Sequence, residues 1–310
     1  MKKFEEIRIV YYGTPEFAVA SLKALVEAGA NVVGVVTAPD KPAGRGKQLQ
    51  ASDVKKYALE AGLNILQPTN MKHEGFIEEL KGLCADLQVV VAFRMMPEVV
   101  WNMPPMGTIN VHGSLLPQYR GAAPINWAII NGEQETGVTT FKLKHEIDTG
   151  DILLQRKVPI GEHDNLGKIY ELLMNEGAAL LVETVKGLAA GTLNEIPQKD
   201  IAVENLKAAP KIFKPDTKID WSKNVMDIYN LIRGLSPYPC AYTDLQDSTM
   251  KIYSASYEVA SHNAAIGSYE TDNKTYLKFA ASDGWIAVED MQLQGKKRMD
   301  IASFLRGFRG

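Results

Sequence analysis

The sequence has few cysteines, no long apolar run and almost no net charge. Its 310 residues include two cysteines, and 34 Lys and Arg nearly balance 37 Asp and Glu. Cys84 and Cys240 are far apart and lack metal-ligand spacing, so we expect a chain from a reducing compartment that binds no metal. No window approaches the roughly eighteen apolar residues of a membrane span, and early charged residues argue against a signal peptide. These absences predict a cytoplasmic protein without a membrane partner, and the total charge does not point to nucleic acid.

A dinucleotide-binding signature is also missing, although the chain begins in a similar way. Residues 7–13 are a β-branched run that ends in glycine, and a helical pattern over residues 14–29 follows at once. Thr14 is the expected N-cap, with Pro15 at the first helical position. The connecting Gly-Thr-Pro-Glu-Phe-Ala lacks the three-glycine spacing that brings backbone close to a pyrophosphate. The sequence therefore argues against NAD or FAD.

Apolar runs alternate with helical patterns over the first part of the chain. The further strand-like runs are residues 31–40, 64–68 and 87–93, and the further helical patterns are residues 51–63 and 75–83. Continuous apolar runs are typical of parallel strands that are covered on both faces. The alternation predicts an α/β fold with a doubly wound, mostly parallel, Rossmann-like sheet, and the polar residues 39–50 are expected to form a loop.

The pattern changes after a long helical segment, which we expect to be broken or bent near Gly177. A polar, proline-containing stretch leads to a helical pattern at residues 224–235, and short strand-like runs follow at close intervals. Such runs, separated by Asp, Asn, Ser and Gly, predict a small β-barrel or half-barrel. We therefore predict a first domain over residues 1–194, a linker over 195–220 and a barrel domain over 221–310.

Candidate catalytic groups lie in two short segments. In INVHGSLLPQYRGAAP, Asn110 and His112 are two apart on a strand, so they share one face near the strand's C-terminal end. An amide N–H beside an imidazole suits a developing oxyanion, although an ordinary hydrogen-bonded polar pair has the same spacing. Asp148, on the expected turn of HEIDTGDIL, could orient His112 and set its tautomer, or serve only its own turn.

A cationic loop, DKPAGRGKQ, carries Lys41, Arg45 and Lys47 among proline and glycine residues. The composition fits a solvated surface loop, and it also fits an arm that becomes ordered on a phosphate backbone. Composition alone favours the surface loop.

Taken together, these segments resemble the folate-dependent formyltransferases, and specifically the branch that acts on methionyl-tRNA. The shared segments occur in the family's order: GTPEFA, PDKPAGRGK, INVHGSLLPQYRGAAPINWAI, ETGVTT, IDTGDIL, KIDWS and GKKRM. All folate-dependent formyltransferases share the Asn-x-His and Asp-Thr-Gly segments, whereas the cationic loop and a second domain mark the tRNA-acting branch. The resemblance implies formyl transfer from 10-formyltetrahydrofolate to the α-amino group of initiator methionyl-tRNA. The alternative acceptor is an amino sugar linked to a nucleotide.

The resemblance also assigns residues. The implied catalytic residues are Asn110, His112 and Asp148; the residues implied to line the folate site are Ser114, Leu115, Leu116 and Pro117; and the residues implied to bind tRNA are Arg45, Lys41 and Lys47. The second domain resembles an OB-type barrel that holds the tRNA, and we expect a monomer. Residues 92–96 and 145–147 depart from the family pattern, and both segments could reshape the wall of the folate pocket.

Overall fold

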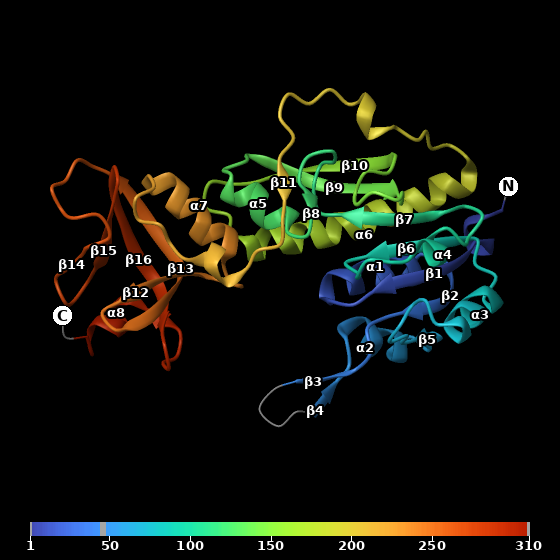
Figure 1. Cartoon of the computed structure of the whole chain (residues 1–310), viewed down its shortest axis with the longest axis horizontal. Coiled ribbons are helices and arrows are strands. Elements are labelled where there is room, and N and C mark those ends of the chain that lie inside the picture. The colour runs from blue at the N-terminus through green and yellow to red at the C-terminus, as the bar shows by residue number, and fades with distance from the viewer. Residues whose placement is uncertain (1, 44–47, 309–310) are drawn as a thin grey trace. The chain divides into compact units, whose positions relative to one another are not determined.

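The computed structural model describes residues 2–43 and 48–308, which form two compact units (Figure 1). The first unit contains residues 1–121, 137–158 and 171–208, and the second contains residues 122–136, 159–170 and 209–310. Within the described ranges, no helix combines the length and the apolar character that crossing a membrane requires.

A seven-stranded sheet forms the first unit, with the strand order β10-β9-β7-β6-β1-β2-β5. Its strands are β1 (Arg8–Gly13), β2 (Asn31–Val36), β5 (Ile65–Leu66), β6 (Leu87–Val91), β7 (Thr108–His112), β9 (Glu135–Lys142) and β10 (Ile152–Pro159). The pairs β1–β2, β1–β6, β2–β5 and β6–β7 are parallel, and β9 runs antiparallel to β7. The predicted α/β fold with a mostly parallel sheet is confirmed.

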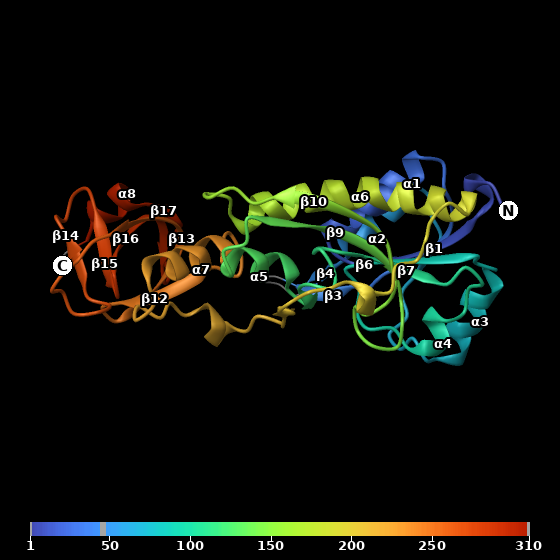
Figure 2. The ribbon, with the colours of Figure 1, turned by 90° about the horizontal axis from the view of Figure 1, so that it is seen from above.

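Helices cover both faces of this sheet, with α1 and α6 on one face and α3 and α4 on the other (Figure 2). The helical elements of this unit are η1 (Phe4–Glu6), α1 (Glu16–Glu27), α2 (Asp53–Glu60), α3 (Glu74–Gly82), α4 (Glu98–Trp101) and α6 (Leu166–Ala190). Two adjacent tyrosines of β1 illustrate the two layers, because successive strand residues face opposite sides. Tyr11 donates its hydroxyl to the carbonyl of Ala18 in α1 (2.6 Å), whereas Tyr12 packs with Phe76 and Val100 of α3 and α4. A strand covered on both faces in this way needs the continuous apolar run that the sequence provides.

Three local predictions are wrong. Helix α1 begins at Glu16, because Pro15 keeps an extended backbone (ψ 175°) and is itself the N-cap in place of Thr14. The polar residues 39–50 are not simply a loop, since β3 (Lys41–Ala43) and β4 (Gln48–Gln50) pair as an antiparallel ribbon. Helix α6 continues through Gly177, where an added Cβ would lie 3.1 Å from the side chain of Val111 in β7. Glycine at this position therefore lets the helix lie close to the sheet.

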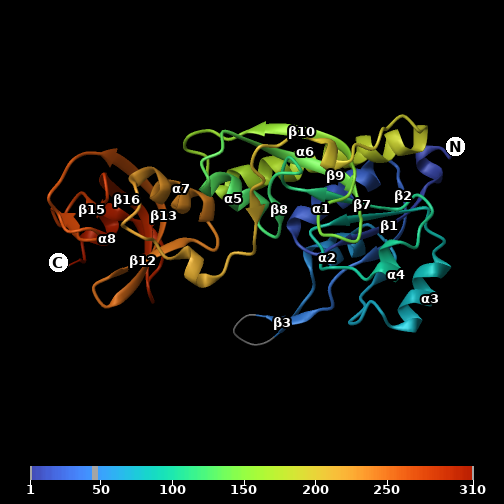
Figure 3. The same ribbon diagram turned by 45° about the horizontal axis from the view of Figure 1, so that its top comes forward.

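The second unit is built on an antiparallel sheet with the strand order β12-β13-β16-β15-β14, and β17 also pairs with β16. Figure 3 labels strands β12, β13, β15 and β16 of this sheet. These strands are β12 (Ala241–Leu245), β13 (Ser248–Val259), β14 (Tyr269–Thr271), β15 (Leu277–Ala281), β16 (Gly284–Leu293) and β17 (Met299–Asp300), and the helices of the unit are α5 (Pro124–Ile130), α7 (Val225–Leu235) and α8 (Ile301–Leu305). Helix α7 packs on β13 and on α5, and its apolar face joins the core of the sheet. This half-barrel confirms the predicted OB-like architecture.

The two cysteines lie in contrasting environments, which predicts different reactivities. Cys84 is exposed, whereas Cys240 is 2% exposed and donates its Sγ hydrogen to the carbonyl of Ile252 (3.0 Å). Burial raises the pKa of the Cys240 thiol to about 12, so almost no thiolate forms at pH 8. Iodoacetamide at pH 8 is therefore expected to alkylate Cys84 and to spare Cys240, as peptide mass spectrometry would show. Unfolding in guanidinium should make both thiols reactive, and equal reactivity in the native protein would contradict the prediction.

Candidate active site

Asn110 and His112 lie on β7, between β6 and β9. Asn110 pairs with Val90 on the parallel side and with Phe141 on the antiparallel side, which holds its backbone from both directions. Its side chain is half-buried and makes no hydrogen bond to any residue in the described ranges. The Asn110 amide is therefore free to donate to a bound molecule.

The imidazole of His112 is held in one tautomer. It is 7% exposed and meets the ring of Phe141 edge-on, with ring centroids 6.4 Å apart. Its Nε2 is hydrogen-bonded to the carbonyl oxygen of Tyr119 at 2.9 Å. A carbonyl oxygen can only accept, so Nε2 carries the hydrogen and Nδ1 is the nitrogen that can exchange a proton.

Asp148 faces that free nitrogen from a tight turn. Its Oδ2 lies 3.9 Å from Nδ1 of His112 and accepts a hydrogen bond from the backbone N–H of Gly121 (2.9 Å). The residue has a φ of 55°, a left-handed conformation that short polar residues tolerate in turns. Gly150 closes the turn where an added Cβ would collide with the carbonyl of Lys142. The structure thus brings together two groups that are far apart in the sequence.

The loop after β7 is tied to the neighbouring strand β9. Thr139 donates its hydroxyl to the carbonyl of Ser114 (2.6 Å) and accepts from the N–H of Leu116 (3.1 Å). Ser114 is fully buried and donates its hydroxyl to the carbonyl of Gln118 (2.6 Å), and Leu116 packs in the core. Pro117, which follows Leu116 through a cis peptide bond, lines a cavity.

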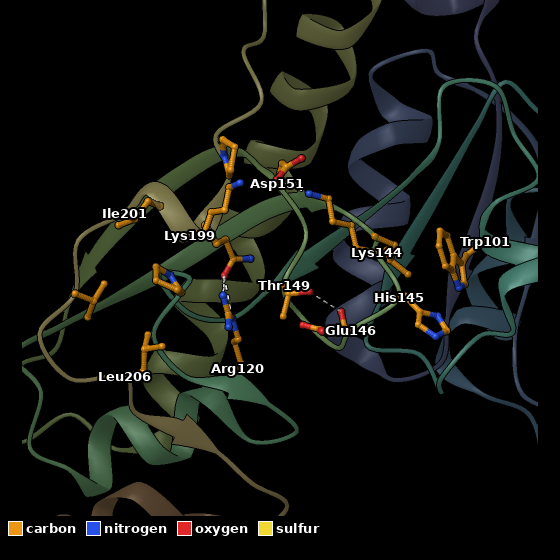
Figure 4. A pocket seen from close by; sticks show the side chains of 15 residues that line it. Trp101, Arg120, Lys144, His145, Glu146, Thr149, Asp151, Lys199, Ile201 and Leu206 are labelled. Carbon is orange, nitrogen blue, oxygen red and sulfur yellow. Dashed lines mark hydrogen bonds and ion pairs between the residues drawn. The ribbon is translucent and has the colours of Figure 1, made fainter.

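This cavity lies beside the Asp148 turn and has a volume of about 800 Å³ (Figure 4). Figure 4 shows Trp101 at one end and Ile201 and Leu206 at the other, with Arg120 and Thr149 between them. The size is within the range of small-molecule sites, which are usually apolar with a few placed polar groups.

Comparison with known proteins identifies the family. The model described as formyl transferase matches residues 7–185, and the model described as formyl transferase, C-terminal domain, matches residues 211–309. The chain is 56% identical to a methionyl-tRNA formyltransferase of Parabacteroides distasonis, covering 100% of this chain and 98% of the relative. A methionyl-tRNA formyltransferase of Phocaeicola vulgatus is 57% identical, with 98% and 97% coverage. The chain belongs to the methionyl-tRNA formyltransferase family.

Solved structures of other formyltransferases share the fold at much lower identity. WlaRD, described as a sugar 3N-formyl transferase in the presence of dTDP and 5-N-formyl-THF, is 20% identical with a TM-score of 0.66. The match covers 94% of this chain and 99% of that one. At this identity the likeness extends to the fold alone.

One residue beside the candidate active site, Gln198, is not marked by any motif or spacing in the sequence. Gln198 lies in η2 (Gln198–Asp200), inside the stretch predicted as a linker, and is 4% exposed. It contacts both the Asp148 turn and Arg120. A lone glutamine in a polar segment has no spacing that marks it, so only the folded chain could reveal it.

Two of the remaining predicted site residues, Lys41 and Leu115, lie within the described ranges. Lys41 is an exposed residue of β3, while Arg45 and Lys47 lie outside the described residues. Leu115 is half-buried and would contact a Cβ added at Gly137.

The two segments that depart from the family pattern differ in their positions. Arg94 donates to the carbonyls of Pro68 (2.5 Å) and Thr69 (3.3 Å), whereas His145 and Glu146 line the cavity. The second departure therefore borders the site directly.

Proposed function

We propose that the chain transfers the formyl group of 10-formyltetrahydrofolate to the α-amino group of initiator methionyl-tRNA, for translation initiation. Methionyl-tRNA formyltransferases that are 56% and 57% identical to this chain over nearly its whole length support methionyl-tRNA as the acceptor. The observation that carries the chemistry is the free Nδ1 of His112, 3.9 Å from Oδ2 of Asp148, beside a cavity of about 800 Å³. The amino-sugar alternative has only the fold of distant neighbours in its favour.

The cavity fits a folate in size and in lining. Trp101, Leu143 and Pro117 offer aromatic and apolar surface to a flat ring system, and Lys199 adds a cationic group that suits a carboxylate tail. Lys144 also lines the cavity, where it forms an ion pair with Asp151 (2.7 Å). We propose that residues 114–117, together with this lining, hold the folate. When bound, the folate supplies the formyl carbon that the amine attacks.

Asn110, His112 and Asp148 each have a distinct role in the proposed reaction. Negative charge develops on the formyl oxygen as the amine attacks, and the unpaired amide of Asn110 donates a hydrogen bond to it. The amine loses a proton, which Nδ1 of His112 accepts, because Nε2 already donates to Tyr119. Asp148 then stabilises the positive charge on the imidazole. The bond between the formyl carbon and the folate nitrogen breaks, and the imidazolium returns its proton to that nitrogen, so that tetrahydrofolate is the leaving group. Since the attacking amine belongs to the substrate, the chain needs no nucleophile of its own.

We further propose that residues 1–194 form the catalytic domain, that residues 195–220 are the connection, and that the barrel of residues 221–310 holds the tRNA. The exposed thiol of Cys84 favours a reducing, cytoplasmic setting.

His112, Asp148 and Asn110 all come from one chain, which favours a monomer as the working species. Light scattering at assay concentration tests the last point, and a stable dimer would contradict it.

The cationic loop supplies a prediction on tRNA binding. Arg45→Ala is expected to raise the Michaelis constant for methionyl-tRNA and to flatten its salt dependence, because one phosphate contact is lost. The kcat should change little. Initial rates at several salt concentrations measure both effects, with Lys23→Ala in α1 as the control for a lost surface charge. An unchanged Michaelis constant would assign the loop to the solvated surface.

The proposed function is tested by supplying labelled 10-formyltetrahydrofolate with either acceptor. Transfer to methionyl-tRNA, and not to a nucleotide-linked amino sugar, is the expected result. Transfer only to the sugar would replace the proposal with the alternative acceptor. Release of formate without any acceptor would indicate a hydrolase.

A further inference from the structure

Gln198 uses its full hydrogen-bonding capacity inside the first unit. Its Nε2 donates to the carbonyls of Asp148 and Gly150, both at 2.8 Å. Its Oε1 accepts from Nε and Nη2 of Arg120, at 3.0 and 2.6 Å. An amide has two donor hydrogens and two acceptor lone pairs, so all four are engaged. A carboxamide is the uncharged side-chain group that offers two donor hydrogens and two acceptor lone pairs together.

These contacts reach the carboxylate of Asp148 by two routes. The Nε2 group of Gln198 binds the backbone carbonyls on either side of Thr149, those of Asp148 and Gly150. The acceptor side holds Arg120, and the N–H of the next residue, Gly121, donates to Oδ2 of Asp148. Gln198 therefore restrains both the backbone of Asp148 and the group that aims its side chain.

We propose that Gln198 is a positioning residue for formyl transfer: it sets the place of the Asp148 carboxylate relative to Nδ1 of His112. This inference rests on the proposed function. Gln198 makes no hydrogen bond to the imidazole, so its effect on the proton acceptor passes through Asp148. It also lines the cavity beside Arg120, and a direct role in holding folate would raise the Michaelis constant for folate. The separation of 3.9 Å between Oδ2 and Nδ1 is the quantity that it controls. A small displacement of a positioned group from its working geometry is enough to slow a reaction strongly.

The test compares two replacements that separate the two sides of the amide. Gln198→Met keeps the length and removes every hydrogen bond, whereas Gln198→Glu keeps an acceptor for Arg120 and loses the donors to the turn. Both variants are expected to lower kcat by about 10- to 100-fold, the usual loss when a supporting hydrogen bond behind a functional group is removed. The Michaelis constants for folate and methionyl-tRNA should stay within about twofold. Asp200→Ala, an exposed change in the same short helix, is the matched control and should leave the rate unchanged.

A second measurement does not depend on activity. The chain has five histidines, so ¹⁵N-histidine labelling gives a short list of imidazole signals. The His112 signal is expected to shift in both Gln198 variants, while the signal of exposed His73 stays in place. Unchanged kcat, or an unchanged His112 signal in folded variants, would overturn the inference. Absence of transfer by the wild type would instead remove the proposed function, and the nuclear magnetic resonance result would still decide what Gln198 positions.

Discussion

Replacing His112 by alanine is expected to lower kcat for formyl transfer to methionyl-tRNA by about 10²- to 10⁴-fold, the usual contribution of a positioned acid–base group. The reason is the hydrogen bond of Nε2 to Tyr119, which leaves Nδ1 as the proton acceptor opposite Asp148. The Michaelis constants should change much less, because the imidazole is 7% exposed and offers little surface to a substrate. Single-turnover transfer of labelled formyl measures the chemical step directly.

The matched control for this variant is His73→Ala. His73 is exposed at the start of α3 and makes no side-chain capping hydrogen bond, so its loss should leave kcat and thermal unfolding unchanged. If His112→Ala retained more than about a tenth of the wild-type kcat, while remaining folded by circular dichroism, His112 would not be the proton acceptor.

Asn110→Ala should reduce kcat by about 10²- to 10³-fold, which corresponds to about 2.7–4 kcal/mol of barrier. The amide is half-buried and unpaired among the described residues, so its hydrogen bond forms only when a substrate oxygen arrives. An interaction that strengthens as charge develops acts on kcat, and substrate binding should therefore be little affected. Steady-state kinetics with both substrates varied separate the two parameters.

Two comparisons sharpen the Asn110 experiment. Asn110→Asp keeps the shape but places a carboxylate against the developing negative charge, so it should lose at least as much rate as the alanine variant. Asn175→Ala, an exposed change in α6, removes an asparagine that does not line the cavity and should have no effect. A purely increased Michaelis constant in Asn110→Ala would reassign the residue to substrate binding.

The sequence predicts those parts of the fold that depend on local periodicity. The apolar run of residues 87–93 contains β6 (Leu87–Val91), and the helical pattern of residues 224–235 contains α7 (Val225–Leu235). Strand β6 is buried along its whole length and α7 buries an apolar face, and both kinds of burial are visible in the order of apolar residues. The placement of Asn110 and His112 on one face of the sheet follows from the two-residue repeat of a strand.

Features that depend on contacts between distant residues could not be predicted in this way. The register Pro42↔Leu49 joins two polar segments that have no strand pattern. Gly177 suggested a break in α6, yet its lack of a Cβ serves the approach of the helix to Val111. The resemblance implied that Asp148 acts with His112, but only the folded chain supplies the separation of 3.9 Å. Gln198 has no signal at all, since its partners lie about 50 to 78 positions away in the chain.

Each unit is made of segments that are separated in the sequence, which limits how the chain can be cut into fragments that fold. Helix α5 belongs to the second unit, where Asn126 donates to the carbonyl of Gly234 (2.9 Å) and Ile130 lies against the same glycine. A fragment truncated after residue 208 would retain α5 but lose α7, and the apolar side chains that α7 covers would face water. Neither half is therefore expected to be autonomous after a single cut, and severed halves should regain activity only if they are produced together.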